Sequence, residues 1–193
     1  MTPERPEALR VALEVIGLLD GLGIRYHLGG SYASSVHGTP RQTQDIDLVI
    51  EVDETSVTEL ISRLPEDYYR DLDIALEAVR QRSSFNLIHL ASGVKIDLFV
   101  RGDEPFDREE FARSREITLA SAPGRTLRVK SAEDTILRKL QWFRLGGEVS
   151  DRQWTDVLGI LANQQTALDF DYLERWAREL EIDDLLEQAR GDA

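Results

Sequence analysis

Apolar residues repeat with two different periods along the first 130 residues of the chain. A period near 3.6 residues predicts a helix, and strict alternation predicts a half-buried strand. The clearest strand is 45–52, where Ile46, Leu48 and Ile50 alternate with Asp45, Asp47 and Val49. Helices are predicted over 6–19, 32–37, 54–63, 72–82 and within 106–114. The other predicted strands are 24–28, a hairpin within 84–100 that turns at "ASG", 115–120 and 126–130.

Helical spacing dominates from Ser131 to the end of the chain. The sequence "SAED" at 131–134 has the serine and acid of a helix start. Apolar stripes follow on three helices, and we expect the three tryptophans on these stripes to pack in the core. The pattern therefore predicts an α/β core over 1–130 and a helical C-terminal subdomain over 131–193 that packs on the core.

Composition places the chain among ordinary globular proteins, with 193 residues, 41% hydrophobic and 31% charged. It contains no cysteine, which excludes disulfides and thiolate metal sites. No apolar run has the length of about 18 residues that spans a bilayer, and the first residues lack a secretory pattern, so we expect a cytoplasmic protein without a membrane partner. The net charge of -13 argues against a broad nucleic-acid footprint, which lysine and arginine would supply.

Three aspartates stand inside apolar strand patterns, where aspartate is otherwise depleted. Asp45 and Asp47 are two residues apart, so they point to the same face of a strand. Asp97 lies in "VKIDLFV", whose Ile96 and Leu98 should face a core. If the two strands are neighbours, three carboxylates meet and could hold divalent cations such as Mg²⁺. Taken singly, each acid could also be a solvated strand edge or a turn cap.

The sequence "GGS", Gly29 to Ser31, lies between a predicted strand and a predicted helix. Glycine lets backbone N–H groups approach an anion, and the following helix N-terminus favours negative charge. The serine hydroxyl could donate to a phosphate oxygen. A tight strand-to-helix turn without a ligand would use the same residues.

The combination of this turn, "DID" at 45–47 and a single later aspartate resembles the polymerase-beta-type nucleotidyltransferase superfamily. The segment from Ser131 to Leu161 further resembles the helical part of AbiEii-type nucleotidyltransferases, which belong to type IV toxin–antitoxin systems. The resemblance implies an α+β nucleotidyltransferase fold, in which helices flank a short mixed β-sheet and a helical C-terminal subdomain follows. It also implies a Mg²⁺-dependent enzyme that moves an NMP group from an NTP to an acceptor hydroxyl and releases pyrophosphate.

The resemblance also assigns roles to single residues. Asp45 and Asp47 would hold the metals and the triphosphate, and Asp97 would ligate metal and help to activate the acceptor. Two Mg²⁺ ions are implied, for which Mn²⁺ could substitute. The residues implied in nucleotide binding are Gly29, Gly30, Ser31, Arg41 and Lys139.

Three functions remain open at this point. An AbiEii-like toxin would act on RNA or protein and could have an antitoxin partner. An enzyme of the aminoglycoside nucleotidyltransferase kind would modify a small cationic molecule, which suits the acidic chain better. A silent module would only bind nucleotide or another protein. An RNA acceptor needs a local basic patch, for which the sequence offers Arg125, Arg128, Lys130, Arg138, Lys139 and Arg144.

Overall fold

The computed structural model describes residues 7–40, 45–118 and 126–193. The chain forms two compact units, which are described separately below. The first unit comprises residues 1–29 and 43–129, and the second comprises residues 30–42 and 130–193. The chain therefore leaves the first unit after residue 29, returns to it before β2, and leaves it again after residue 129. The two domains expected from the sequence, 1–130 and 131–193, stay a prediction.

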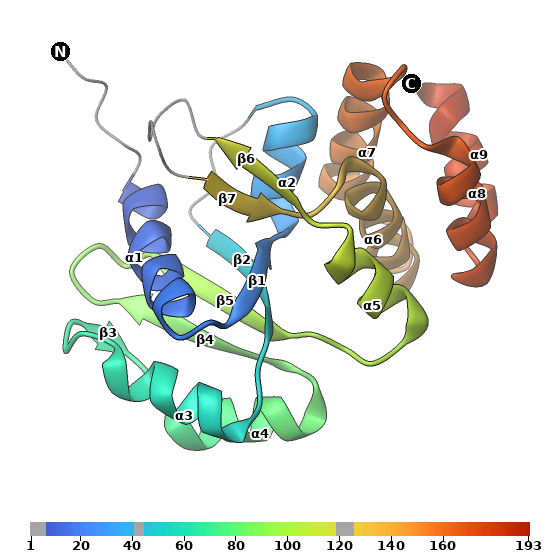
Figure 1. Cartoon of the computed structure of the whole chain (residues 1–193). Coiled ribbons are helices and arrows are strands. Elements are labelled where there is room, and N and C mark those ends of the chain that lie inside the picture. The colour runs from blue at the N-terminus through green and yellow to red at the C-terminus, as the bar shows by residue number, and fades with distance from the viewer. Residues whose placement is uncertain (1–6, 41–44, 119–125) are drawn as a thin grey trace, which may run out of the picture. The chain divides into compact units, whose positions relative to one another are not determined.

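In its described residues, the first unit contains a seven-stranded mixed sheet with the order β3-β4-β5-β2-β1-β7-β6 (Figure 1). Strand β2 runs parallel to β5, and β1 runs parallel to β7, whereas the other neighbouring pairs are antiparallel. The mixed sheet with its helices confirms the α+β fold class expected from the sequence. The strands are β1 (Arg25–Leu28), β2 (Asp45–Glu51), β3 (Tyr68–Tyr69), β4 (Ser84–His89), β5 (Lys95–Val100), β6 (Arg115–Thr118) and β7 (Thr126–Val129).

One face of this sheet carries the core of the first unit. Side chains alternate along β2 and β5, so that Ile46, Leu48, Ile96 and Leu98 are at most 1% exposed. Helices α1 and α4 contact strands of the sheet, and α3 contacts both of these helices (Figure 1). The helices of this unit are α1 (Glu7–Gly21), α3 (Glu54–Arg63), α4 (Leu72–Gln81) and α5 (Pro105–Ala112). The predicted hairpin is confirmed, because β4 and β5 pair antiparallel.

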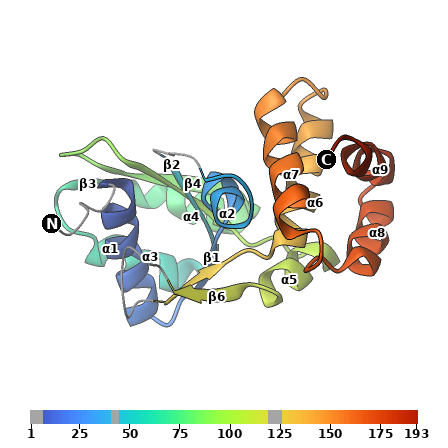
Figure 2. The same ribbon diagram turned by 90° about the horizontal axis from the view of Figure 1, so that it is seen from above.

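The second unit is helical in its described part. In Figure 2, α2 and α9 are seen nearly end-on and α7 is seen from the side. Helix α2 packs against α6 and α7, and α8 packs against α6 and α9. Ser131 and Ser150 are the N-caps of α6 and α7, and each side chain accepts a hydrogen bond from a backbone N–H three residues later. The helices are α2 (Gly30–His37), α6 (Ala132–Leu145), α7 (Asp151–Gln164), α8 (Phe170–Glu179) and α9 (Asp183–Asp192).

The expectation that all three tryptophans pack in the core is wrong for Trp142, which is 56% exposed on α6. The reason is its position around the helix axis. Ile136, Leu137 and Leu140 form the buried side of α6. Each residue turns the helix by about 100°, so Trp142 is rotated by about 200° from Leu140 and faces the opposite side. Trp176 on α8 is buried, as expected.

No helix in the described part of the chain is both long enough and apolar enough to cross a membrane.

Candidate active site

The acids singled out in the sequence come together on the first unit's sheet. Strands β2 and β5 pair in parallel with Asp47 opposite Asp97 and Asp45 opposite Lys95. Because partners across a ladder point to the same face, these four side chains share the face opposite the core. Asp45 is exposed, and Asp47 and Asp97 are partly buried. The condition set in the sequence analysis, that the two acid-bearing strands are neighbours, is therefore met.

Lys95 is a member of this cluster that the sequence analysis missed. Its Nζ lies 2.8 Å from Oδ2 of Asp97, within hydrogen-bonding distance. The hydrogen bond to Asp97 raises the pKa of the Lys95 ammonium, and the charges of Asp97, Asp45 and Asp47 raise that pKa further. The sequence signal was present, because a residue two positions before Asp97 must share its face, but the ion pair itself depends on side-chain placement.

The donor set of this face suits a hard divalent cation, because carboxylate oxygens are the ligands that Mg²⁺ takes in proteins. The ammonium of Lys95 binds the Asp97 carboxylate at a place where a metal ion could bind it instead. Within residues 7–40, 45–118 and 126–193, no three His, Cys, Asp or Glu side chains are grouped closely enough to hold a metal ion. Asp97 is engaged by Lys95 in this arrangement, and the three-acid, two-ion site stays a prediction.

The predicted glycine turn begins beside the acids. The backbone N–H of Gly29 donates to the carbonyl oxygen of Asp47 at 2.9 Å, which continues the β1–β2 pairing up to the turn. Gly30 has φ +49°, in the left-handed region that glycine adopts without a Cβ penalty. Gly30 and Ser31 open α2 of the second unit, where Ser34 and Ser35 donate back to the carbonyls of Gly30 and Ser31. A phosphate role for Gly29, Gly30 and Ser31 stays a prediction.

Lys139, expected to face the nucleotide, is held by another helix of the second unit. Its Nζ lies 2.7 Å from Oδ2 of Asp156 on α7, and the two side chains are only 12% and 9% exposed. A nucleotide would have to compete with this carboxylate for the ammonium. The nucleotide role of Lys139 stays a prediction, and Arg41 lies outside the described residues.

We expect Asp156→Ala to lower the free energy of unfolding by about 2–3 kcal/mol, because it leaves a largely buried ammonium without its counter-ion. Urea unfolding of the full chain measures this loss. The double variant Lys139→Met/Asp156→Leu should recover most of it, since it removes both charges and fills the space with apolar atoms. A loss below about 0.5 kcal/mol for Asp156→Ala, the range of ordinary surface changes, would contradict the expectation.

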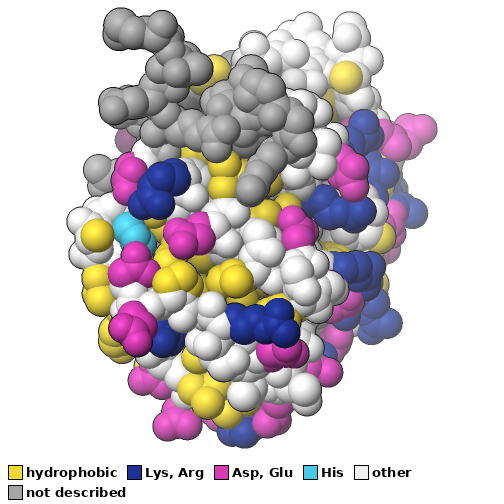
Figure 3. Space-filling view, turned by 60° about the vertical axis from the view of Figure 1, so that its left-hand side comes forward, with side chains coloured by type: hydrophobic (Ala, Val, Ile, Leu, Met, Phe, Trp, Pro, Cys, Tyr) yellow, Lys and Arg dark blue, Asp and Glu magenta, His cyan; other side chains and the backbone are white. Residues whose placement is uncertain are grey.

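Among the six basic residues proposed for an RNA-binding patch, Arg128, Lys139 and Arg144 are paired with acids. Arg128 pairs with Glu116 on β6, and Arg144 pairs with Asp184 and Glu148. Lys130 is buried, and Arg125 lies outside the described residues. On the face seen in Figure 3, lysine and arginine side chains lie among aspartates and glutamates. These pairings leave less free positive charge than the sequence suggested.

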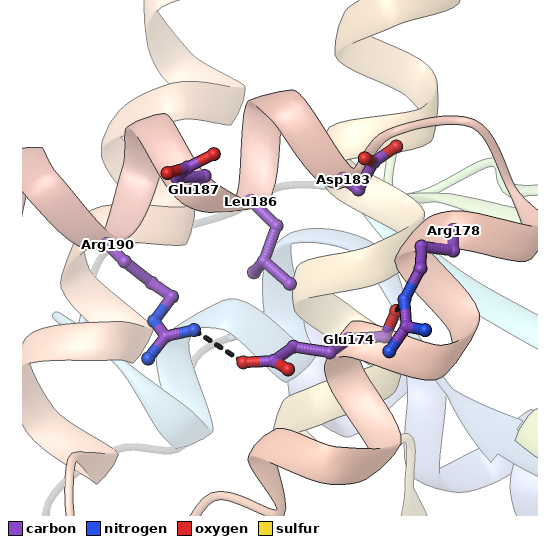
Figure 4. A pocket seen from close by; sticks show the side chains of 6 residues that line it. All are labelled: Glu174, Arg178, Asp183, Leu186, Glu187 and Arg190. Carbon is purple, nitrogen blue, oxygen red and sulfur yellow. Dashed lines mark hydrogen bonds and ion pairs between the residues drawn. The ribbon is translucent and has the colours of Figure 1, made fainter.

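A pocket of about 440 Å³ lies between α8 and α9 of the second unit (Figure 4). Charges of both signs line it, and Glu174 and Arg190 form an ion pair of 2.8 Å across it. Of the expected active-site residues that the structure describes, none lines this pocket. The lining residues are Glu174, Arg178, Asp183, Leu186, Glu187 and Arg190.

Comparisons with known proteins bear on the fold. No protein-family model and no curated protein matches the sequence. Among solved structures, the chain is similar to an antigenic nucleotidyltransferase-like protein from Paracoccidioides brasiliensis, with a TM-score of 0.62 and 21% identity over 96% of this chain and 88% of that one.

Two antibiotic-modifying proteins are also similar. ANT(2'')-Ia in complex with adenylyl-2''-tobramycin gives a TM-score of 0.59 and 14% identity over 91% of this chain and 98% of that one. The lincomycin-bound lincosamide adenylyltransferase LnuA gives a TM-score of 0.52 and 15% identity, with coverages of 85% and 98%. The chain therefore has the fold of nucleotidyltransferases, as the sequence predicted. None of these three structures is described as an AbiEii-type protein, so the likeness does not extend to that subgroup.

Proposed function

We propose that the protein is a divalent-metal-dependent nucleotidyltransferase, which moves an NMP group from an NTP to an acceptor hydroxyl. The observation that carries the proposal is the register of β2 and β5, which sets Asp47 opposite Asp97 with Asp45 on the same face. Carboxylates opposite one another on neighbouring strands repel each other. The Lys95 ammonium offsets part of this repulsion at Asp97, and a bound divalent cation would offset more of it. The nucleotidyltransferase fold supports the same assignment.

In this proposal Asp45 and Asp47 hold the metal and the metal-bound triphosphate. A bound metal would lower the pKa of the acceptor hydroxyl and neutralise the charge that develops on the phosphate oxygens. Asp97 accepts the hydroxyl proton while the acceptor oxygen forms a bond to the α-phosphorus. The bond from the α-phosphorus to the bridging oxygen breaks, and pyrophosphate leaves with that oxygen.

Nucleotide binding is assigned to the glycine turn and to two basic residues. The backbone N–H groups at the start of α2 would meet the phosphates, because Gly30 needs no space for a Cβ and a helix N-terminus favours anions. Lys139 would contribute once its ammonium leaves Asp156. The proposed nucleotide-binding residues are Gly29, Gly30, Ser31, Arg41 and Lys139.

For the acceptor, the first candidate is the RNA or protein target of an AbiEii-like toxin. An antitoxin would then be a partner of this protein. The support for this candidate is the sequence resemblance of the segment from Ser131 to Leu161, and the N-capped helices α6 and α7 within that segment. The second candidate is a small cationic acceptor, which the net charge of -13 and the paired arginines favour. Both candidates share the chemistry of the acid cluster and differ in the acceptor alone.

A label-transfer assay tests the proposal. Purified protein receives Mg²⁺ or Mn²⁺, each α-labelled NTP in turn, and one of four acceptors: total RNA, the protein itself, a cell lysate or a panel of aminoglycosides. We expect label on one acceptor class, and we expect Asp45→Asn/Asp47→Asn to abolish it. Asp73→Asn, at an exposed acid of α4, is the matched control and should keep full activity. Label that survives the double substitution would overturn the proposed site.

A further inference from the structure

We propose that Lys95 is a built-in counter-cation of the acid cluster, which a divalent cation must displace from Asp97, so that Lys95 sets the metal affinity of the site. This inference rests on the proposed function, because it concerns the same three acids. It adds a residue that the resemblance did not assign, and it predicts an effect on metal binding that needs no nucleotide and no acceptor.

The geometry places Lys95 where a cation would compete with it. Its Nζ is 2.8 Å from Oδ2 of Asp97, and its register partner on β2 is Asp45. On the other side, β4 offers Ile88 opposite Lys95 and Asn86 opposite Asp97, neither of which carries a charge. The charged groups on this stretch of the paired strands β4, β5 and β2 are therefore the three acids and Lys95 itself.

The lysine can leave Asp97 without unfolding the strand. Its side chain is 41% exposed, against 21% for Asp97, so the ammonium has solvent to move into. Ile96, next to it in the strand, is anchored in the core on the opposite face. Release therefore requires a rotamer change of one long side chain, while the backbone pairing with β2 stays intact.

Electrostatics gives the direction of the effect. The three carboxylates carry three negative charges when ionised, and the ammonium offsets one of them. A divalent cation that takes Asp97 as a ligand must displace the Lys95 ammonium from that carboxylate. The displaced ammonium then stays near the bound cation and repels it. A partly exposed ion pair contributes about 1 kcal/mol at most, which is a factor of about 5 in affinity, so a neutral residue at position 95 should tighten metal binding by about 3- to 5-fold.

Mn²⁺ titration of the full chain without nucleotide, followed by the EPR signal of free Mn²⁺, tests this inference. We expect Lys95→Gln to bind Mn²⁺ about 3- to 5-fold more tightly than the unchanged protein. Lys95→Arg keeps the positive charge and should bind Mn²⁺ within about 2-fold of the unchanged protein, because the attraction between residue 95 and the carboxylates is the same. Arg128→Gln removes one positive charge from an exposed pair with Glu116 and controls for the change in net charge.

The outcomes separate this inference from the proposed function. Equal or weaker Mn²⁺ binding by Lys95→Gln, while Asp45→Asn/Asp47→Asn removes binding, would overturn the role of Lys95 and leave the metal site standing. An equal gain in Arg128→Gln would also overturn it, because net charge alone would then explain the effect. Mn²⁺ binding that Asp45→Asn/Asp47→Asn leaves unchanged, or no binding at all, would overturn both the metal site and the inference.

Discussion

Asp97→Asn is expected to lower the turnover of nucleotidyl transfer by about 100- to 10,000-fold, the usual contribution of a positioned general base. An amide cannot accept the proton of the acceptor hydroxyl, and it is a poorer metal ligand than a carboxylate. NTP affinity should change by less than about 3-fold, because Asp45 and Asp47 still hold the metal-bound triphosphate. Steady-state kinetics with the acceptor found by label transfer, together with NTP binding by calorimetry, measures the two effects separately.

Two further variants make this result interpretable. Asp73→Asn changes the same side chain on an exposed turn of α4 and should leave turnover within about 2-fold, like other surface changes. Asp97→Asn also frees the Lys95 ammonium, so the double variant Lys95→Gln/Asp97→Asn tests whether a displaced lysine causes the loss. Turnover that survives Asp97→Asn would contradict the assigned proton transfer, and NTP binding without turnover in the unchanged protein would favour a silent binding module.

Leu48→Ala should lower the free energy of unfolding by about 3–5 kcal/mol, at the upper end of the range for leucine in a core. Leu48 is fully buried in β2, the central strand of the sheet, and faces away from the acids. The truncation removes apolar burial and leaves a cavity that the paired strands β1 and β5 are too constrained to close. Urea unfolding followed by circular dichroism measures the loss.

The same substitution at an exposed leucine is the control. Leu90, which follows β4, is 62% exposed, so Leu90→Ala should cost less than about 0.5 kcal/mol. Equal losses at the two positions would mean that the core does not lie on the face that the burial pattern indicates.

The acid-bearing strands show which parts of the candidate site the sequence can predict. Alternation alone puts Asp45, Asp47 and Asp97 on polar faces, because the period of a strand fixes which side chains share a face. It cannot give the parallel pairing of β2 with β5, since that depends on long-range packing of segments about fifty residues apart. The pairing that places Lys95 opposite Asp45, and the ion pair with Asp97, were therefore invisible before the structure.

Other elements were missed for local reasons. Strand β3 has only two residues, which is too short for any alternation to register. Helix α9 was not singled out, although Leu185, Leu186 and Ala189 have helical spacing and are buried. The Lys139–Asp156 pair joins residues on two different helices, and the sequence offers no rule for choosing that partner over a ligand.

The three passages of the chain between the two units have a consequence for protein engineering. Helix α2 packs on α6 and α7, yet it is encoded between β1 and β2. Truncation after residue 130 would remove the two helices that α2 contacts, and Ala33 and Ser34, which are buried on α2, would lose their cover. A chimera that exchanges the helical part with a relative must therefore carry residues 30–42 along with the C-terminal segment. Recombination in a directed-evolution library would tolerate paired crossovers at these points far better than a single one.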